Sequence, residues 1–262
     1  MSRWLPLVFV VLTTMARAGE PTLVALLDDG SLVVFRPGDT APIRTLAPRG
    51  ISGQLVGIDQ RPADGRLYGL AGGTDVYTID PTTGEATLVS TLTVAFDGDV
   101  RSGVDFTPAL DRLRLVSADG RNLRVNVSLG ATAVDTPLAY APGDPHAGAR
   151  PRIGAAGYAN NRPGVATTTL FEIDSDLDVL VIQDPANDGV LKTVGALGVD
   201  FGPLAGFDIV TDAEGHDRAY AASGRNLHVV DLQSGRATPA GSIPGAARPV
   251  VSLAVIADGS GP

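Results

Sequence analysis

Three aspartates, each two residues after a glycine, occur in separate parts of the chain and are the first candidates for chemistry. They stand in Gly57-Ile58-Asp59, Gly103-Val104-Asp105 and Gly206-Phe207-Asp208. If the three segments are equivalent parts of a repeated fold, their carboxylates lie at one height around an axis. Grouped carboxylates either raise one another's pKa or bind a cation such as calcium together with carbonyl groups and water. The alternative is structural, with each aspartate accepting backbone amides or pairing with an arginine of a neighbouring unit. We expect the structural role and assign no metal or cofactor.

A second candidate group consists of arginines and asparagines within two predicted strands. Its members are Arg112, Arg114, Asn122, Arg124 and Asn126. Alternation places the two arginines of the first strand on one sheet face and the polar residues of the second strand on one face. Guanidinium groups bind carboxylates in a bidentate manner. We expect pairing with acids such as Asp111 or Asp135, and the alternative is a groove for an anionic or carbohydrate ligand.

The remaining polar candidates do not define an enzyme class. His146 lies in the long loop 141–152, and His216 and His228 lie in different contexts, so no histidine metal site is predicted. Neither a Gly-x-Ser-x-Gly elbow nor a phosphate-binding loop occurs. Paired carboxylates can hydrolyse glycosides, and Tyr158 is available for sugar stacking. A hydrolase or lyase that uses the three aspartates is therefore the alternative to a binding module.

The elements that position these residues recur about five times along the chain. One copy combines Gly57–Asp59, Arg66–Leu70, Asp75–Asp80 and Ala86–Val89, each a short run typical of a strand. A period of about fifty residues indicates a repeat architecture, and four strands per unit are typical of a β-propeller blade. A turn of the type Asp80-Pro81-Thr82-Thr83-Gly84 separates the third and fourth strands, so we interpret these aspartates as turn formers.

The number and closure of the blades follow from the spacing of the inner strands. Equivalent positions within them are Gly57, Gly103, Gly157, Gly206 and Ser252. This alignment places Ala159 and Ala254 at the position that aspartate occupies elsewhere, so the acids would not form a full ring. The first unit shows three strands only, and 249–256 supplies the missing inner strand. The sequence predicts an all-β, five-bladed propeller of four-stranded antiparallel blades, with the first blade closed by the C-terminal strand.

The ends and the charge of the chain indicate where it acts. Residues 1–18 combine Arg3, an apolar run too short to span a bilayer, and Ala16-Arg17-Ala18, features of a secretory signal peptide. We expect residues 19–262 to form one exported domain, periplasmic or secreted. Its net charge of −11 without Arg3 and Arg17 disfavours nucleic acid as a partner. No later apolar run suggests membrane insertion, and we expect a monomer.

Several sequence segments resemble those of the exported bacterial family known as "domain of unknown function 4394". The resemblance rests on Gly57–Leu70, Asp111–Ser117, Arg121–Asn126 and Gly195–Asp200, and it covers about residues 22–256. Asn160-Asn161 after the fourth inner strand also match the family's pattern. The resemblance implies a propeller-like extracytoplasmic domain and brings no established activity.

Together these observations predict an exported binding or interaction module. Its ligand is a small molecule, glycan or protein at the mouth of the channel. The candidate ligand-binding residues are Asp59, Asp105, Asp208, Arg114, Arg124, Asn122, Asn160, Tyr158 and His146.

Overall fold

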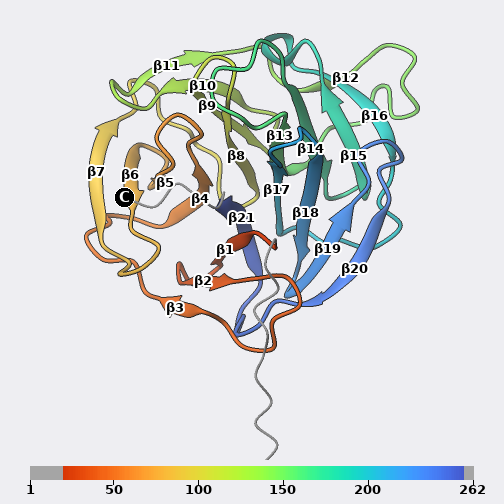
Figure 1. Cartoon of the computed structure of the whole chain (residues 1–262). Coiled ribbons are helices and arrows are strands. Elements are labelled where there is room, and N and C mark those ends of the chain that lie inside the picture. Colours follow the sequence, from red (N-terminus) through yellow and green to blue (C-terminus); the bar gives the residue numbers. More distant parts are fainter. Residues whose placement is uncertain (1–19, 257–262) are drawn as a thin grey trace, which may run out of the picture.

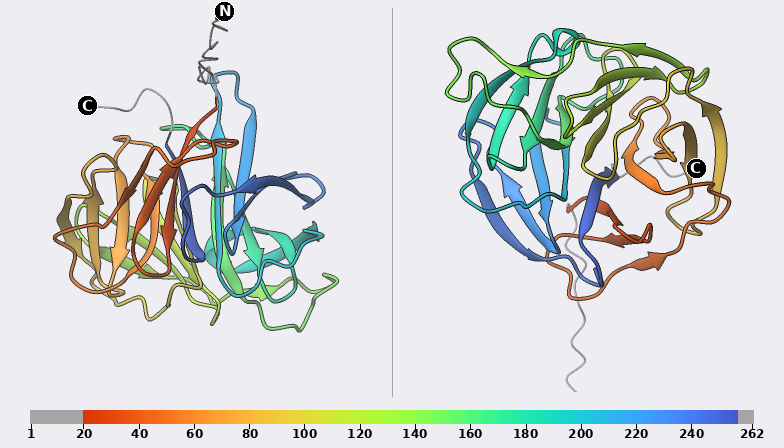
Figure 2. Two further views of the ribbon diagram at one scale, coloured as in Figure 1. Left: turned by 90° about the horizontal axis from the view of Figure 1, so that it is seen from below. Right: turned by 180° about the vertical axis from the view of Figure 1, so that it is seen from behind.

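The chain forms a five-bladed β-propeller in a computed structural model that describes residues 20–256 (Figure 1). The predicted signal peptide, residues 1–18, lies outside the described residues. Short runs of Val, Leu, Ile and Tyr form the strands because β-branched and aromatic side chains pack well on a pleated surface. Each blade is a sheet of at least four strands, of which four are antiparallel and run from the axis to the rim, and Figure 2 shows the ring from the side and from behind.

Blades 2, 3 and 5 are continuous in sequence. Blade 2 contains β4 (Leu55–Gln60), β5 (Leu67–Ala71), β6 (Asp75–Ile79) and β7 (Ala86–Thr91). Blade 3 contains β8 (Ser102–Thr107), β9 (Arg112–Ser117), β10 (Asn122–Asn126) and β11 (Ala131–Val134). Blade 5 contains β17 (Ala205–Thr211), β18 (Asp217–Ser223), β19 (Asn226–Val230) and β20 (Ala237–Ser242). These twelve strands confirm the predicted repeat.

Blade 4 departs from the pattern by one extra strand. It contains β13 (Ile153–Ala159), β14 (Thr169–Asp174), β15 (Val179–Gln183) and β16 (Val190–Ala196). The short β12 (Ala139–Tyr140), on the connection from blade 3, pairs in parallel with β16. The 3₁₀ turn η1 (Ala186–Asp188) precedes β16. The connection thus covers the rim of blade 4, which the prediction of four strands did not include.

Blade 1 is built from both ends of the described chain, as predicted. β21 (Val250–Ile256) pairs with β1 (Thr22–Leu27), and β2 (Leu32–Phe35) and β3 (Arg44–Leu46) complete the sheet. The register opposes Thr22 to Ile256, so both ends of the described chain leave at the same end of this blade. We call this end the bottom face; the loops that lead into the inner strands lie on the opposite, top face.

The turns between third and fourth strands join neighbouring blades at the rim. Asp80 accepts the backbone amide of Thr82, and Asp231 accepts those of Gln233 and Ser234, which are hydrogen bonds of turn formers. The turn glycines contact the preceding blade: a Cβ on Gly130, which has φ 68°, would meet the Thr91 carbonyl oxygen. The structure therefore explains both the aspartates and the glycines of the repeat.

Candidate functional site

The three candidate aspartates converge inside the ring. Asp59 on β4, Asp105 on β8 and Asp208 on β17 each have about 1% of their surface exposed. One carboxylate oxygen from each lies within 4.8 Å of those of the other two. Alternation within the inner strands turns these side chains towards a common centre. Their convergence around one axis was predicted, and in the structure all three side chains are buried.

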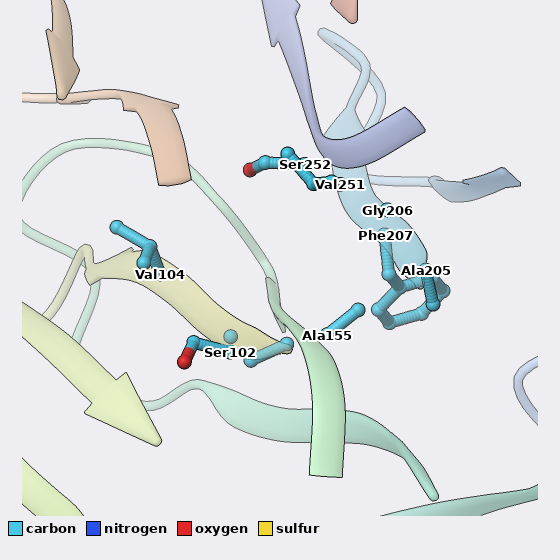
Figure 3. A pocket seen from close by; sticks show the side chains of 10 residues that line it. Ser102, Val104, Ala155, Ala205, Gly206, Phe207, Val251 and Ser252 are labelled. Carbon is cyan, nitrogen blue, oxygen red and sulfur yellow. The ribbon is translucent and has the colours of Figure 1, made fainter. Parts of the chain in front are cut away.

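The space between the inner strands is narrow, and its walls leave no room for a water-sized sphere. Figure 3 shows the walls, where Ser102, Ala155 and Ser252 project from three different inner strands. A space this narrow does not admit a ligand from the top face.

Backbone amides occupy most of the carboxylate oxygens. Asp59 accepts the amide of Gln60 at 2.6 Å and that of Phe106, in the next blade, at 2.7 Å. Asp208 accepts the amide of Ile209 at 2.6 Å and that of Val255, in blade 1, at 2.5 Å. Each of these two aspartates therefore accepts one backbone amide of its own blade and one of the following blade.

Asp105 completes the ring of amides with a single bond. It accepts the amide of Tyr158 in blade 4 at 3.2 Å. With this bond, one equivalent amide from each of the five inner strands is satisfied by a carboxylate. The register also corrects the alignment of blade 4. Asp105 bonds to the residue after Gly157, so Gly157 occupies the aspartate position that we had predicted for Ala159.

The remaining interaction of Asp105 requires a proton. One of its carboxyl oxygens lies within 4.8 Å of a carboxyl oxygen of Asp208, and two buried carboxyl groups this close are favoured when one of them is protonated. Burial, and then the negative charges of Asp59 and Asp208, raise the pKa of Asp105. Burial raises the pKa of Asp208 to about 7, although its two amide bonds oppose the shift. Because Asp105 has fewer amide donors among residues 20–256, we assign the proton to Asp105.

The arginine and asparagine candidates form a second buried cluster, between blades 3 and 4. Arg114 is 2% exposed and donates to Asn122 at 2.6 Å, Asp135 at 2.7 Å and Asn187 at 2.8 Å. Its Nε lies 3.4 Å from the Tyr158 hydroxyl. Arg124 makes a bidentate pair with Asp135. The predicted pairing with Asp135 is present, whereas Asp111 pairs with Arg61 of blade 2.

The other two candidates lie apart from both clusters. Asn160 follows β13 on the bottom face with φ 53°, and its side-chain amide donates to the Thr167 carbonyl. His146 lies in loop 141–152, and its ring centroid is 5.5 Å from that of Tyr140. The structure therefore divides the nine candidates among the channel, the seam between blades 3 and 4, a bottom turn and one loop.

Two buried acids that the sequence did not suggest lie beneath loop 141–152. Asp174, at the end of β14, accepts the Tyr140 hydroxyl at 2.8 Å and the Arg152 amide at 3.0 Å, one at each end of the loop. Glu172 is fully buried two residues earlier. The only signal in the sequence was a glutamate within the otherwise apolar run Leu170–Ile173.

The top face of blades 3 and 4 carries exposed ion pairs. Arg121 pairs with Asp97 at 2.9 Å, Arg101 with Asp99 at 2.8 Å, and Arg152 with Asp176 at 3.6 Å. Exposed pairs of this kind add about 0–1 kcal/mol to stability, so a ligand can replace one partner at little cost.

Comparison with known proteins identifies the family and the fold. A family model described as "Domain of unknown function (DUF4394)" matches residues 31–254. No curated protein matches the chain. A solved structure of a protein of unknown function from Bacteroides thetaiotaomicron has a TM-score of 0.53 and 17% identity, and covers 86% of this chain and 56% of its own. An auxiliary nutrient binding protein from Bacteroides ovatus has a TM-score of 0.46 and 15% identity, with coverages of 82% and 58%. At 17% identity the likeness to the Bacteroides thetaiotaomicron structure shows the fold alone. This chain spans little more than half of either protein.

Proposed function

The chain belongs to the DUF4394 family, and we propose that it is an exported module that binds a glycan or a protein across its top face. The observation that carries this proposal is that the channel carboxylates are committed to backbone amides below an opening too narrow for water. A ligand at the top face would then contact the polar groups of its loops, among them the exposed ion pairs of blades 3 and 4. A small molecule held inside the channel is not favoured.

The same observation weighs against a hydrolase or lyase. Such an enzyme needs at least two carboxyl groups that reach a substrate. Asp59, Asp105 and Asp208 are buried and satisfy one another and the backbone. Export to the periplasm or the medium is supported by the features of residues 1–18. Within residues 20–256, no helix has the length and apolar character needed to cross a membrane.

A thermal-shift screen of residues 19–262 against glycans, peptides and organic acids tests the proposal. A specific ligand stabilises the folded state by an amount that grows with its concentration over Kd. We expect Arg121→Gln with Arg101→Gln to remove the stabilisation. The matched bottom-face variant Arg218→Gln, which loses an exposed pair with Glu20, should retain it. A ligand whose effect survives the top-face changes and disappears in Arg218→Gln would overturn the assignment of the face.

A further inference from the structure

Glu172 is a buried acid without a protein donor. Its exposed fraction is 0%, and neither carboxylate oxygen has a hydrogen-bond partner among residues 20–256. Removing an ionised carboxylate from water costs several kcal/mol unless charges or donors compensate it. The group is therefore held where its neutral, protonated form is strongly preferred.

The charged and titratable groups facing Glu172 come from both sides of the seam. Arg114 of β9 favours ionisation of Glu172, and Asp174 on its own strand opposes it. Tyr140 of β12 and Tyr158 of β13 also lie within electrostatic reach. Burial is the largest influence and raises the pKa of Glu172 to about 8. Arg114 compensates only in part because its guanidinium already donates to Asn122, Asp135 and Asn187.

Asp174 connects this position to loop 141–152. Glu172 and Asp174 are two residues apart on one strand, so their side chains share the sheet face towards blade 3. Asp174 binds the Tyr140 hydroxyl and the Arg152 amide, which bracket the loop. The loop is also held by Asp144, which accepts the backbone amide and the hydroxyl of Thr193 on β16. It projects beyond the rim beside β12 and β16 (Figures 1 and 2).

We propose that Glu172 is a proton-binding switch that controls how firmly loop 141–152 is held on the ring. When Glu172 is protonated it adds no charge beside Asp174, which binds both ends of the loop. When Glu172 loses its proton, a second buried negative charge lies beside Asp174. Relief comes from opening the seam to water, which releases the bonds to Tyr140 and Arg152. This inference does not depend on what the top face binds.

Hydrogen–deuterium exchange tests the switch in the mature protein at about pH 6 and about pH 9, with rates corrected for the intrinsic effect of pH. We expect the wild-type peptide spanning 140–153 to exchange at least about threefold faster at the higher pH after correction. The peptide spanning 92–101, on another top-face loop, should not change. Equal corrected rates for 140–153 at both pH values in the wild type would overturn the proposal without any variant.

A pair of substitutions assigns the effect to Glu172. Glu172→Gln keeps the shape and removes the titration, so its 140–153 peptide should exchange equally at both pH values. Glu85→Gln makes the same chemical change at an exposed glutamate and should behave like the wild type. A pH effect that persists in Glu172→Gln would show that another group is responsible.

Discussion

At the scale of single residues, the three channel aspartates have unequal roles. Asp59 and Asp208 each use both carboxylate oxygens to accept amides of two adjacent blades. Asp105 accepts one amide, and we assign to it the proton that lets two neighbouring buried carboxyl groups coexist. Because an asparagine has one acceptor oxygen and one donor group, it can replace a protonated aspartate but not a doubly accepting carboxylate.

This difference gives a prediction for isosteric variants. Asp105→Asn should change the free energy of unfolding by less than about 1 kcal/mol, since its side-chain amide can donate to Asp208. Asp59→Asn should lose about 1–3 kcal/mol, because one buried backbone amide would then face another donor. Urea unfolding of both variants at one pH measures the contrast. Equal losses would show that Asp105 is ionised or that the register of the ring is different.

Some of these residue positions could be predicted from the sequence and others could not. Equivalent Gly-x-Asp segments were sufficient to predict that the three acids converge. They could not fix the register of blade 4, because the residue two before Gly157 is Ala155 and the glycine that marks other inner strands is absent there. Glu172 was missed because a lone strand glutamate is ordinarily on the exposed face. Its burial depends on blade 3 packing against it, a tertiary effect without a local signal.

At the scale of elements, the rim turns determine how closely blades pack. Gly130 is left-handed, with φ 68°, and a Cβ there would lie 1.9 Å from the Thr91 carbonyl oxygen of blade 2. Gly143 in loop 141–152 has φ 85° and no atom within 4 Å of the same position. Both glycines have a positive φ. They differ in that a Cβ at Gly130 would meet the neighbouring blade, whereas a Cβ at Gly143 would meet no atom.

The pair separates conformational strain from blade packing. Gly143→Ala should cost about 1 kcal/mol, the usual penalty of a left-handed alanine. Gly130→Ala should cost at least about 2 kcal/mol more, because the turn must withdraw from β7. Differential scanning calorimetry of both variants checks this. Similar melting temperatures would contradict the role assigned to the turn.

At the scale of the whole molecule, β21 closes the ring through backbone pairing and through Asp208. β21 pairs with β1 along its length, and its Val255 amide donates to Asp208 of blade 5. Deleting residues 249–262 exposes β1 as a sheet edge and removes the Val255 amide from Asp208, which keeps the Ile209 amide. We expect aggregation or loss of a cooperative transition in a melting experiment. A truncated protein that stays monomeric with an unchanged melting temperature would contradict non-covalent closure.

The buried acids also set the pH dependence of the whole molecule. Acids whose pKa is raised on folding, Asp208 to about 7 and Glu172 to about 8, bind protons more tightly in the folded state. Their contribution to stability is present in acid and is lost as the pH rises through these values. Burial lowers the pKa of His228, which acts in the opposite sense. Its contribution reduces stability as the pH falls below 6.5, the ordinary pKa of histidine.

We therefore expect the free energy of unfolding to fall by a few kcal/mol between about pH 6 and about pH 9. Urea unfolding across this range measures the change. Glu172→Gln should make the decline shallower, whereas the exposed-site control Glu85→Gln should leave it as in the wild type. A stability that rises with pH over this interval would be incompatible with protonated acids in the core.

We propose that the channel carboxylates hold the blades together and do not bind a cation. The melting temperature of the mature protein in EDTA and in calcium chloride tests it directly, because a cation bound only to the folded state would stabilise it. We predict that the melting temperature of the wild type is the same in both solutions. The melting temperature of Asp105→Asn should likewise not differ between EDTA and calcium chloride. A melting temperature that falls in EDTA, recovers in calcium and no longer responds in Asp105→Asn would show that the three aspartates form a cation site.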